Sequence, residues 1–318
     1  MVHQSPVRTI DLDRWRHGTP TERDAVADTF DASMREAGFV VLVGHGVADD
    51  LRAEVRAAAM EFFGLPDATK ERYRAVALGT RGWIPFGSEA NSYASGEPTP
   101  PDLKESYVLT TADLPGHDGA LASMWPEEVP TFRAAGIAFL AAVEEVHLEV
   151  MGLAAAALGL DDLGYFVDRA GHANVCNINW YPPLERVGPP LPGQWRIGPH
   201  SDFGSVTVLD RQPGLGGLQV QLTDGTWADA PWVEGSLVLN CADLLAAWSN
   251  GRWRLAPHRV LPPSDQAPGE SLVSLVYFCE PDPAVTIGPI PGVGEPDGFE
   301  PFLAGDYMKM KLDQITVA

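Results

Sequence analysis

His200 and Asp202 are side chains of the metal-ligating type and are separated by a single residue. Side chains alternate between the two faces of an extended strand, so residues two apart point to the same face and can share one metal ion. A third ligand has to come from elsewhere, and His258 is the natural candidate because a later strand could lie beside the first. Two neutral imidazoles and one carboxylate on one face of iron(II) leave positions open for a bidentate co-substrate and then dioxygen. The three residues therefore predict a catalytic iron site, although the same ligands could hold zinc with an open water position, as in a hydrolase.

The tripeptide His-x-Asp is common by itself, and the segments around it make it informative. In chain order these segments are Gly198-Pro199, Phe203-Gly204, Gly216–Val220, Asp224-Gly225-x-Trp227, Asn240-x-x-Asp243 and Trp248–Gly251. The ordered set resembles the isopenicillin N synthase-like branch of the iron(II)/2-oxoglutarate-dependent oxygenases. Earlier segments extend the resemblance over most of the chain: Ile10–Leu12, Gly38–Val40, Gly44–Val47 and Asp102–Glu105.

The resemblance implies an α+β protein with a double-stranded β-helix (jelly-roll) core, flanking helices and a mainly helical N-terminal region. It also implies iron(II), dioxygen and 2-oxoglutarate as cofactors, with the iron on His200, Asp202 and His258. The segment Asn179-x-Tyr181 resembles the one from which family members direct an amide and a phenol toward the co-substrate carboxylates. Both side chains carry suitable hydrogen-bond donors, so we expect them in the co-substrate site.

The chain departs from the family at the residue that anchors the distal carboxylate of 2-oxoglutarate. Family members place an Arg-x-Ser there, because a guanidinium binds a carboxylate through two parallel, charge-assisted hydrogen bonds. Counting back from Phe278–Pro281, Ser274 matches the serine, whereas Leu272 occupies the arginine position. Three hypotheses follow. In the first, another cation takes the place of the missing arginine, with Arg196 as the leading candidate and Arg211 as the second. In the second, 2-oxoglutarate binds only weakly. In the third, the chain does not use 2-oxoglutarate, as isopenicillin N synthase does not.

The leading prediction is an oxidoreductase that oxidises an unactivated C–H bond of a small, secondary-metabolite-like molecule. Hydroxylation, desaturation and ring closure all stay open. A 2-oxoglutarate-independent iron(II) oxidase is the first alternative. The second is a non-catalytic small-molecule binding protein in which Leu272 marks lost co-substrate binding. A binding protein has no physical need for three metal ligands, so the complete set favours the enzyme.

Hydrophobic periodicity predicts the elements that must position these residues. Val26, Phe30 and Met34 recur at helical spacing after Thr19 and Pro20, which suit a helix start. A helix is expected over 49–63, and either one long helix or a pair broken near Gly152 and Gly159 over 130–160. We also expect a short buried strand over 39–43 and an irregular loop over 78–101 that could cover the site. The pattern then changes to short β-rich segments, at 175–181, 205–209, 217–222, 237–239 and 272–278, which is typical of a sandwich or barrel.

Composition excludes several other classes of protein. At 318 residues with 45% hydrophobic content, the chain can bury a sizeable core. Its formal charge of −21 would repel nucleic-acid phosphates and anionic lipid headgroups, so we expect neither nucleic acid nor a membrane as a partner. Cys176, Cys241 and Cys279 lie in apolar segments and suit reduced thiols. The first residues hold no apolar run after a basic stretch. We therefore expect a cytoplasmic protein.

The order of the predicted elements divides the chain into a mainly helical N-terminal region over 1–120 and a catalytic core over 121–318, which comprises the jelly roll and its supporting helices.

Overall fold

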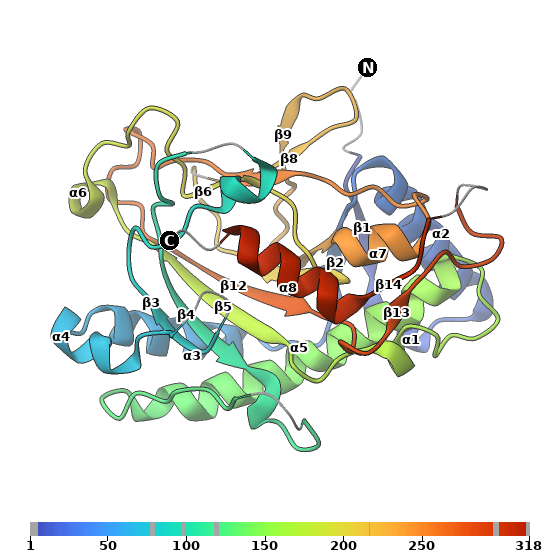
Figure 1. The fold of residues 1–318 in the computed structure, drawn as a ribbon, viewed down its shortest axis with the longest axis horizontal. Helices are drawn as coiled ribbons and strands as arrows, with labels where there is room; N and C mark the ends of the chain where they lie inside the picture. Colours follow the sequence, from blue (N-terminus) through green and yellow to red (C-terminus); the bar gives the residue numbers. More distant parts are fainter. Residues whose placement is uncertain are drawn as a thin grey trace.

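Two β-sheets face each other across the centre of the molecule (Figure 1). The computed structural model describes residues 6–76, 80–96, 99–117, 121–215, 217–294 and 299–315. The larger sheet has the strand order β1 (Arg8–Asp11), β2 (Phe39–Val43), β10 (Leu237–Cys241), β7 (Val206–Asp210), β12 (Leu272–Cys279), β5 (Val175–Tyr181), β4 (Glu105–Thr110) and β3 (Gly82–Ile84). The smaller sheet has the order β6 (Ile197–His200), β11 (His258–Val260), β8 (Leu218–Gln221) and β9 (Trp227–Asp229), and β13 (Thr286–Ile287) pairs with β14 (Phe302–Leu303). This arrangement confirms the predicted jelly-roll core.

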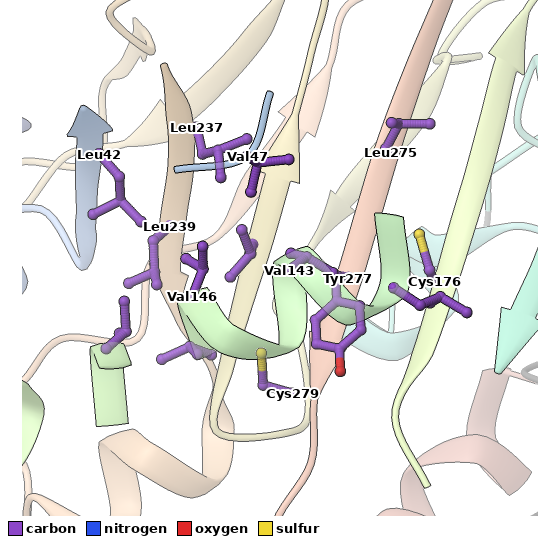
Figure 2. Packing of buried hydrophobic residues seen from close by; sticks show 14 of the residues in the cluster. Leu42, Val47, Val143, Val146, Cys176, Leu237, Leu239, Leu275, Tyr277 and Cys279 are labelled. Atoms are coloured by element: carbon purple, nitrogen blue, oxygen red, sulfur yellow. The ribbon is translucent and has the colours of Figure 1, made fainter. Parts of the chain in front are cut away.

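The longest helices pack against the outer face of the larger sheet. The α-helices are α1 (Leu12–His17), α2 (Pro20–Glu36), α3 (Asp49–Phe63), α4 (Asp67–Lys70), α5 (Pro130–Ala157), α6 (Leu184–Val187), α7 (Asp243–Trp248) and α8 (Ala304–Ile315). Short 3-10 helices are η1 (Glu71–Tyr73), η2 (Asn91–Ser95), η3 (Thr111–Asp113) and η4 (Val167–Arg169). Figure 2 shows Val143 and Val146 of α5 beside Leu239 of β10 and Tyr277 of β12, in the apolar layer between helix and sheet.

The central strands divide their side chains between this apolar layer and the interior between the two sheets. In β7, Val208 packs in the helix-facing core, whereas Thr207 and Leu209 line the interior. In β12, Tyr277 belongs to the helix-facing core, and Val276 lines the interior. The strict alternation follows from the two-residue repeat of a strand. One face of the sheet therefore stabilises the fold, and the other is left for a site.

The predicted elements before residue 160 are largely confirmed. A capping box begins α2, because the backbone N–H of Glu22 donates to the Thr19 hydroxyl and the Glu22 carboxylate accepts from the Thr19 N–H at 2.9 Å. Gly38 ends this helix region with a φ of 69°, a left-handed conformation that favours glycine. The predicted strand over 39–43 and helix over 49–63 coincide with β2 and α3.

Two predictions about the elements need correction. The segment 78–101 was expected to be irregular, yet it contributes β3 to the edge of the larger sheet and the 3-10 helix η2. Residues 77–79 and 97–98 of this segment lie outside the described residues. The C-terminal helix α8 was not predicted. Within the described ranges, none of the helices has the length and apolar character needed to span a bilayer. The division at residue 120 stays a prediction.

Candidate metal centre

The three predicted ligands lie together between the sheets. His200 ends β6, His258 begins β11, and the two residues are directly paired across these strands. Asp202 lies just beyond β6, with Oδ1 3.6 Å from Nε2 of His200 and Oδ2 3.8 Å from Nε2 of His258. Each residue offers one ligand atom, and these atoms lie within 4.8 Å of one another. Within the part of the chain that the structure describes, this is the only group of three or more such side chains.

Hydrogen bonds orient both imidazoles toward this cluster. Nδ1 of His200 lies 2.8 Å from the carbonyl oxygen of Gly198, and Nδ1 of His258 lies 3.3 Å from that of Ala256. A carbonyl oxygen only accepts, so each Nδ1 carries the proton and each Nε2 presents its lone pair. Burial lowers the pKa of His258 to about 4, which keeps this imidazole neutral at physiological pH. The donor set of two neutral imidazoles and one carboxylate fits iron(II).

The Asp202 carboxylate is held in place by two neighbouring strands. Its Oδ2 accepts from the hydroxyl of Thr207 in β7 at 2.6 Å and from the side-chain amide of Asn240 in β10 at 2.8 Å. Burial acts to raise the pKa of Asp202, but His258, His200 and these two hydrogen bonds outweigh it and hold the pKa below its usual value. The carboxylate is therefore charged, as a metal ligand must be.

Thr207 could not be found from the sequence, because a lone threonine in an apolar strand carries no sequence signal. Asn240 belongs to the segment Asn240-x-x-Asp243 of the sequence resemblance, and its amide supports the Asp202 carboxylate. Asp243 does not contact the ligand side chains directly, but it binds the segment that carries them. It accepts from the hydroxyl of Ser201 at 3.2 Å, and on its other side from Tyr307 at 2.6 Å and Lys311 at 2.8 Å, both in α8. The C-terminal helix is thus tied to the ligand segment.

A cavity opens beside the three ligands. Its apolar lining comes from both sheets and includes Phe39, Ile197, Leu209, Leu218, Val276 and Phe278. Its remaining lining is polar and includes Glu89, Asn91, Lys104, Asn177 and Asn179. Lys104 pairs with Glu89 and donates to Ser106 at 2.9 Å, so its charge is neutralised locally. An apolar cavity with a few convergent polar groups is the usual form of a small-molecule site.

A second hollow adjoins this cavity. The two share Tyr181, Leu209, Leu218 and Val260 in their walls, and the second adds Arg211, Gln212, Leu272 and Ser274. The hydroxyl groups of Tyr181 and Ser274 lie 3.1 Å apart, and Leu272 is paired with Tyr181 across β12 and β5. Of the predicted co-substrate residues, Asn179 lines the cavity that holds the metal ligands, Ser274 lines the adjoining hollow, and Tyr181 lines both.

The predicted cation Arg196 lies outside the lining of both hollows. Its guanidinium carbon lies 5.8 Å from the centre of the Tyr181 ring. Its Nη1 is 2.8 Å from Glu270, and its side chain is fully buried. The role of Arg196 toward the co-substrate stays a prediction; in this structure its charge is paired with Glu270. Arg211 reaches the second hollow instead.

A larger hollow of about 570 Å³ lies elsewhere, between α1, α2 and α5, and includes His45 in its lining. Both ring nitrogens of His45 make hydrogen bonds within the protein. Nε2 lies 2.7 Å from the carbonyl oxygen of Gly235, and Nδ1 accepts from the N–H of Val47 at 3.1 Å. His45 is thus a hydrogen-bonded turn histidine. The three metal-ligating side chains lie at the smaller cavity instead.

Comparison with protein families gives two matches in chain order. Residues 7–131 match the family described as non-haem dioxygenase in morphine synthesis N-terminal. Residues 171–281 match the 2OG-Fe(II) oxygenase superfamily. The second match spans β5 through β12 and contains all three predicted metal ligands.

Similar proteins and structures point the same way. The chain is 37% identical to Validamycin A dioxygenase of Streptomyces hygroscopicus subsp. limoneus over 98% of this chain and 87% of that protein. It is 31% identical to Scopoletin 8-hydroxylase of Arabidopsis thaliana over 85% of this chain and 71% of that protein. Among solved structures, a full-length Neurospora crassa protein in complex with alpha-KG and thymine superposes with a TM-score of 0.83 at 29% identity, covering 96% of both chains.

Proposed function

Because the chain belongs to the 2OG-Fe(II) oxygenase superfamily, we propose that His200, Asp202 and His258 bind iron(II) and that 2-oxoglutarate binds beside them, with its distal end toward the adjoining hollow that contains Ser274. The enzyme is an iron-dependent dioxygenase that uses 2-oxoglutarate and acts on a small molecule. When bound, iron(II), dioxygen and 2-oxoglutarate supply the oxidising power, and 2-oxoglutarate is decarboxylated to succinate. The juxtaposition of the three ligand atoms with one cavity carries the proposal.

The protein's contribution is to present the ligands in the correct charge state and to exclude water. Asp202 is already a carboxylate and His258 already neutral, so metal binding at these two residues displaces no proton. The direct pairing of His200 in β6 with His258 in β11 sets the two imidazoles side by side. The apolar residues around the ligands, among them Phe39 and Phe278, limit the access of water to the reacting centre.

The polar part of the cavity indicates the chemistry of the substrate. Asn177, on the interior face of β5, has a buried side-chain oxygen with no hydrogen-bond partner among the described residues. Buried acceptors are normally satisfied, so a bound molecule with a hydroxyl or ammonium donor would complete this one. Glu89 and Asn91 add further polar groups nearby. We propose a substrate rich in hydrogen-bonding groups, with validamycin A as the first compound to test because of the similarity to Validamycin A dioxygenase.

The test uses the anaerobically purified full chain loaded with iron(II) and 2-oxoglutarate. Admission of dioxygen with validamycin A should give succinate well above the level formed without it, together with an oxidised product detected by mass spectrometry. The Asp202→Ala variant should give neither. Succinate formation that does not respond to validamycin A would overturn the substrate proposal, and retention of stoichiometric iron by Asp202→Ala would overturn the ligand assignment.

A further inference from the structure

The distal carboxylate of 2-oxoglutarate needs a positive partner in the second hollow, and the usual residue cannot provide it. Leu272 stands opposite Tyr181 in the pairing of β12 with β5, so an apolar side chain occupies the position from which an arginine would reach the carboxylate. A buried carboxylate without a cation is strongly disfavoured. If 2-oxoglutarate binds with useful affinity, another strand must supply the charge.

The register of β7 directs Arg211 into this hollow. Thr207 and Leu209 line the interior between the sheets, and Asp210 points the opposite way, where it pairs with Arg56 at 2.6 Å. Arg211 is next, so the two-residue repeat returns it to the interior side. The pairing of β7 with β12 ends where Asp210 meets Leu275, and Arg211 and Ser274 are the next residues on the two sides of that end. The side chain of Arg211 does line the hollow that contains Tyr181 and Ser274.

Among the described residues, no carboxylate forms an ion pair with Arg211, in contrast to Arg196, which pairs with Glu270 at 2.8 Å. The Nη2 of Arg211 donates to the backbone carbonyl oxygens of Ala230 at 2.8 Å and Pro231 at 2.7 Å, which orient the guanidinium but do not neutralise it. Its Nε is buried and has no hydrogen-bond partner in the described part of the chain. A half-buried guanidinium with an unused donor is suited to receive an anion.

We propose that Arg211 binds the distal carboxylate of 2-oxoglutarate in place of the arginine that Leu272 replaces, with the hydroxyl groups of Tyr181 and Ser274 as further donors. β7 and β12 are neighbours in the sheet, so the cation comes from the adjacent strand and still reaches the same end of the cavity. The inference rests on the proposed function, because it assumes that 2-oxoglutarate binds at the metal.

The experiment compares two ligands of the same chain length. Apoprotein loaded anaerobically with iron(II) is titrated with 2-oxoglutarate and, separately, with 2-oxopentanoate, which lacks the distal carboxylate, while the visible charge-transfer band of the chelate is followed. In Arg211→Met the Kd for 2-oxoglutarate should rise about 10- to 100-fold, and the Kd for 2-oxopentanoate should change little. A general disturbance of the site would weaken both ligands equally, so the ratio of the two values reports the carboxylate contact itself.

Two further variants keep the result interpretable. Arg254→Met is the matched control, because Arg254 is another half-buried arginine whose Nη2 donates to a backbone carbonyl, that of Leu222 at 3.0 Å, and it lines neither hollow. It should keep the ratio of the unaltered protein. Leu272→Arg, introduced into Arg211→Met, should recover much of the lost preference for 2-oxoglutarate, because it restores a guanidinium opposite Tyr181.

The possible failures are distinguishable. If the unaltered protein binds iron but shows no band with 2-oxoglutarate, the proposed function fails before Arg211 is tested. If the unaltered protein gives the band and Arg211→Met retains the same ratio, the function stands and the assignment of Arg211 is overturned. In that case a loss of preference in Arg196→Met would assign the role to Arg196.

Discussion

His200 and His258 are cross-strand partners: the antiparallel pairing of β6 with β11 sets them opposite each other, and their ring centres lie 4.3 Å apart. Neither histidine has the other as a neighbour in sequence, so the ligand geometry exists only when the smaller sheet has formed. Metal affinity and folding are therefore coupled, since a preformed site is absent from the unfolded chain. This relationship leads to the first prediction.

Iron(II) should stabilise the protein against unfolding, and the effect should depend on His258. A ligand that binds only the folded state adds about 2.7 kcal/mol when its free concentration is 100 times Kd. We expect anaerobic thermal or urea unfolding to show such a gain for the unaltered protein and almost none for His258→Ala. His172→Ala is the control, because this exposed histidine lies outside the ligand cluster. An equal gain in His258→Ala would contradict the site.

Replacing Thr207 by valine should weaken metal binding without unfolding the protein. The change keeps the side-chain shape but removes the hydroxyl that donates to Asp202 Oδ2 at 2.6 Å, and loss of such a ligand support costs about 10- to 100-fold in metal affinity. Equilibrium dialysis against iron(II) under argon measures the effect. Thr111→Val is the matched control, because Thr111 is equally buried and donates to backbone carbonyls away from the site. Equal affinities in the two variants would refute the role of Thr207.

The metal-free protein should lose stability as pH rises, and Glu280 should be a main cause. Burial, with the Asp202 charge as a second cause, raises the pKa of Glu280 to about 8 from its usual value of 4.5. Between these two pH values the folded state keeps a proton that the unfolded state has lost, so the free energy of unfolding falls as pH increases. The loss is on the order of 3 kcal/mol.

The Glu280→Gln variant isolates this contribution. Its advantage in free energy of unfolding over the unaltered protein should be small at pH 5 and should grow toward pH 8, as measured by urea titration in the presence of a metal chelator. Saturation with a divalent metal should reduce the difference, because positive charge beside Asp202 makes ionisation of Glu280 easier. An advantage independent of pH would show that the carboxyl is not protonated in the fold.

Lys70→Met should destabilise the protein by about 3 kcal/mol, because it leaves a buried carboxylate with less compensation. Lys70 is fully buried, and its Nζ lies 2.9 Å from Glu105, a residue of β4 that also accepts from Trp83 of β3 at 3.1 Å. Urea unfolding of the metal-free protein measures the loss. The double variant Lys70→Met with Glu105→Gln should recover part of it, since the unpaired charge is then gone. No recovery would indicate that lost packing, and not lost charge pairing, causes the effect.

Much of the secondary structure could be predicted from sequence because the relevant signals are local. The Thr19 cap and the apolar repeat ending at Met34 specify α2 within a few residues of its observed ends. The prediction failed for β3, because Gly82–Ile84 is a strand only by virtue of its pairing with β4. It also missed α8, whose attachment depends on Tyr307 and Lys311 meeting the distant Asp243. Both failures concern elements that distant partners stabilise.

The sequence by itself determined the metal-ligand set and the class of chemistry, because the types and order of His200, Asp202 and His258 within their motifs are properties of the linear chain. It also revealed that Leu272 breaks the usual carboxylate anchor. Only the tertiary structure distinguishes the two candidate arginines: Arg211 lines the hollow that contains Ser274, and Arg196 lines neither hollow. That difference depends on the position of Arg211 just beyond β7, beside β12, and on Glu270, which pairs with Arg196 from a distant segment. A register and an ion pair between distant residues arise from packing, and no local pattern encodes them.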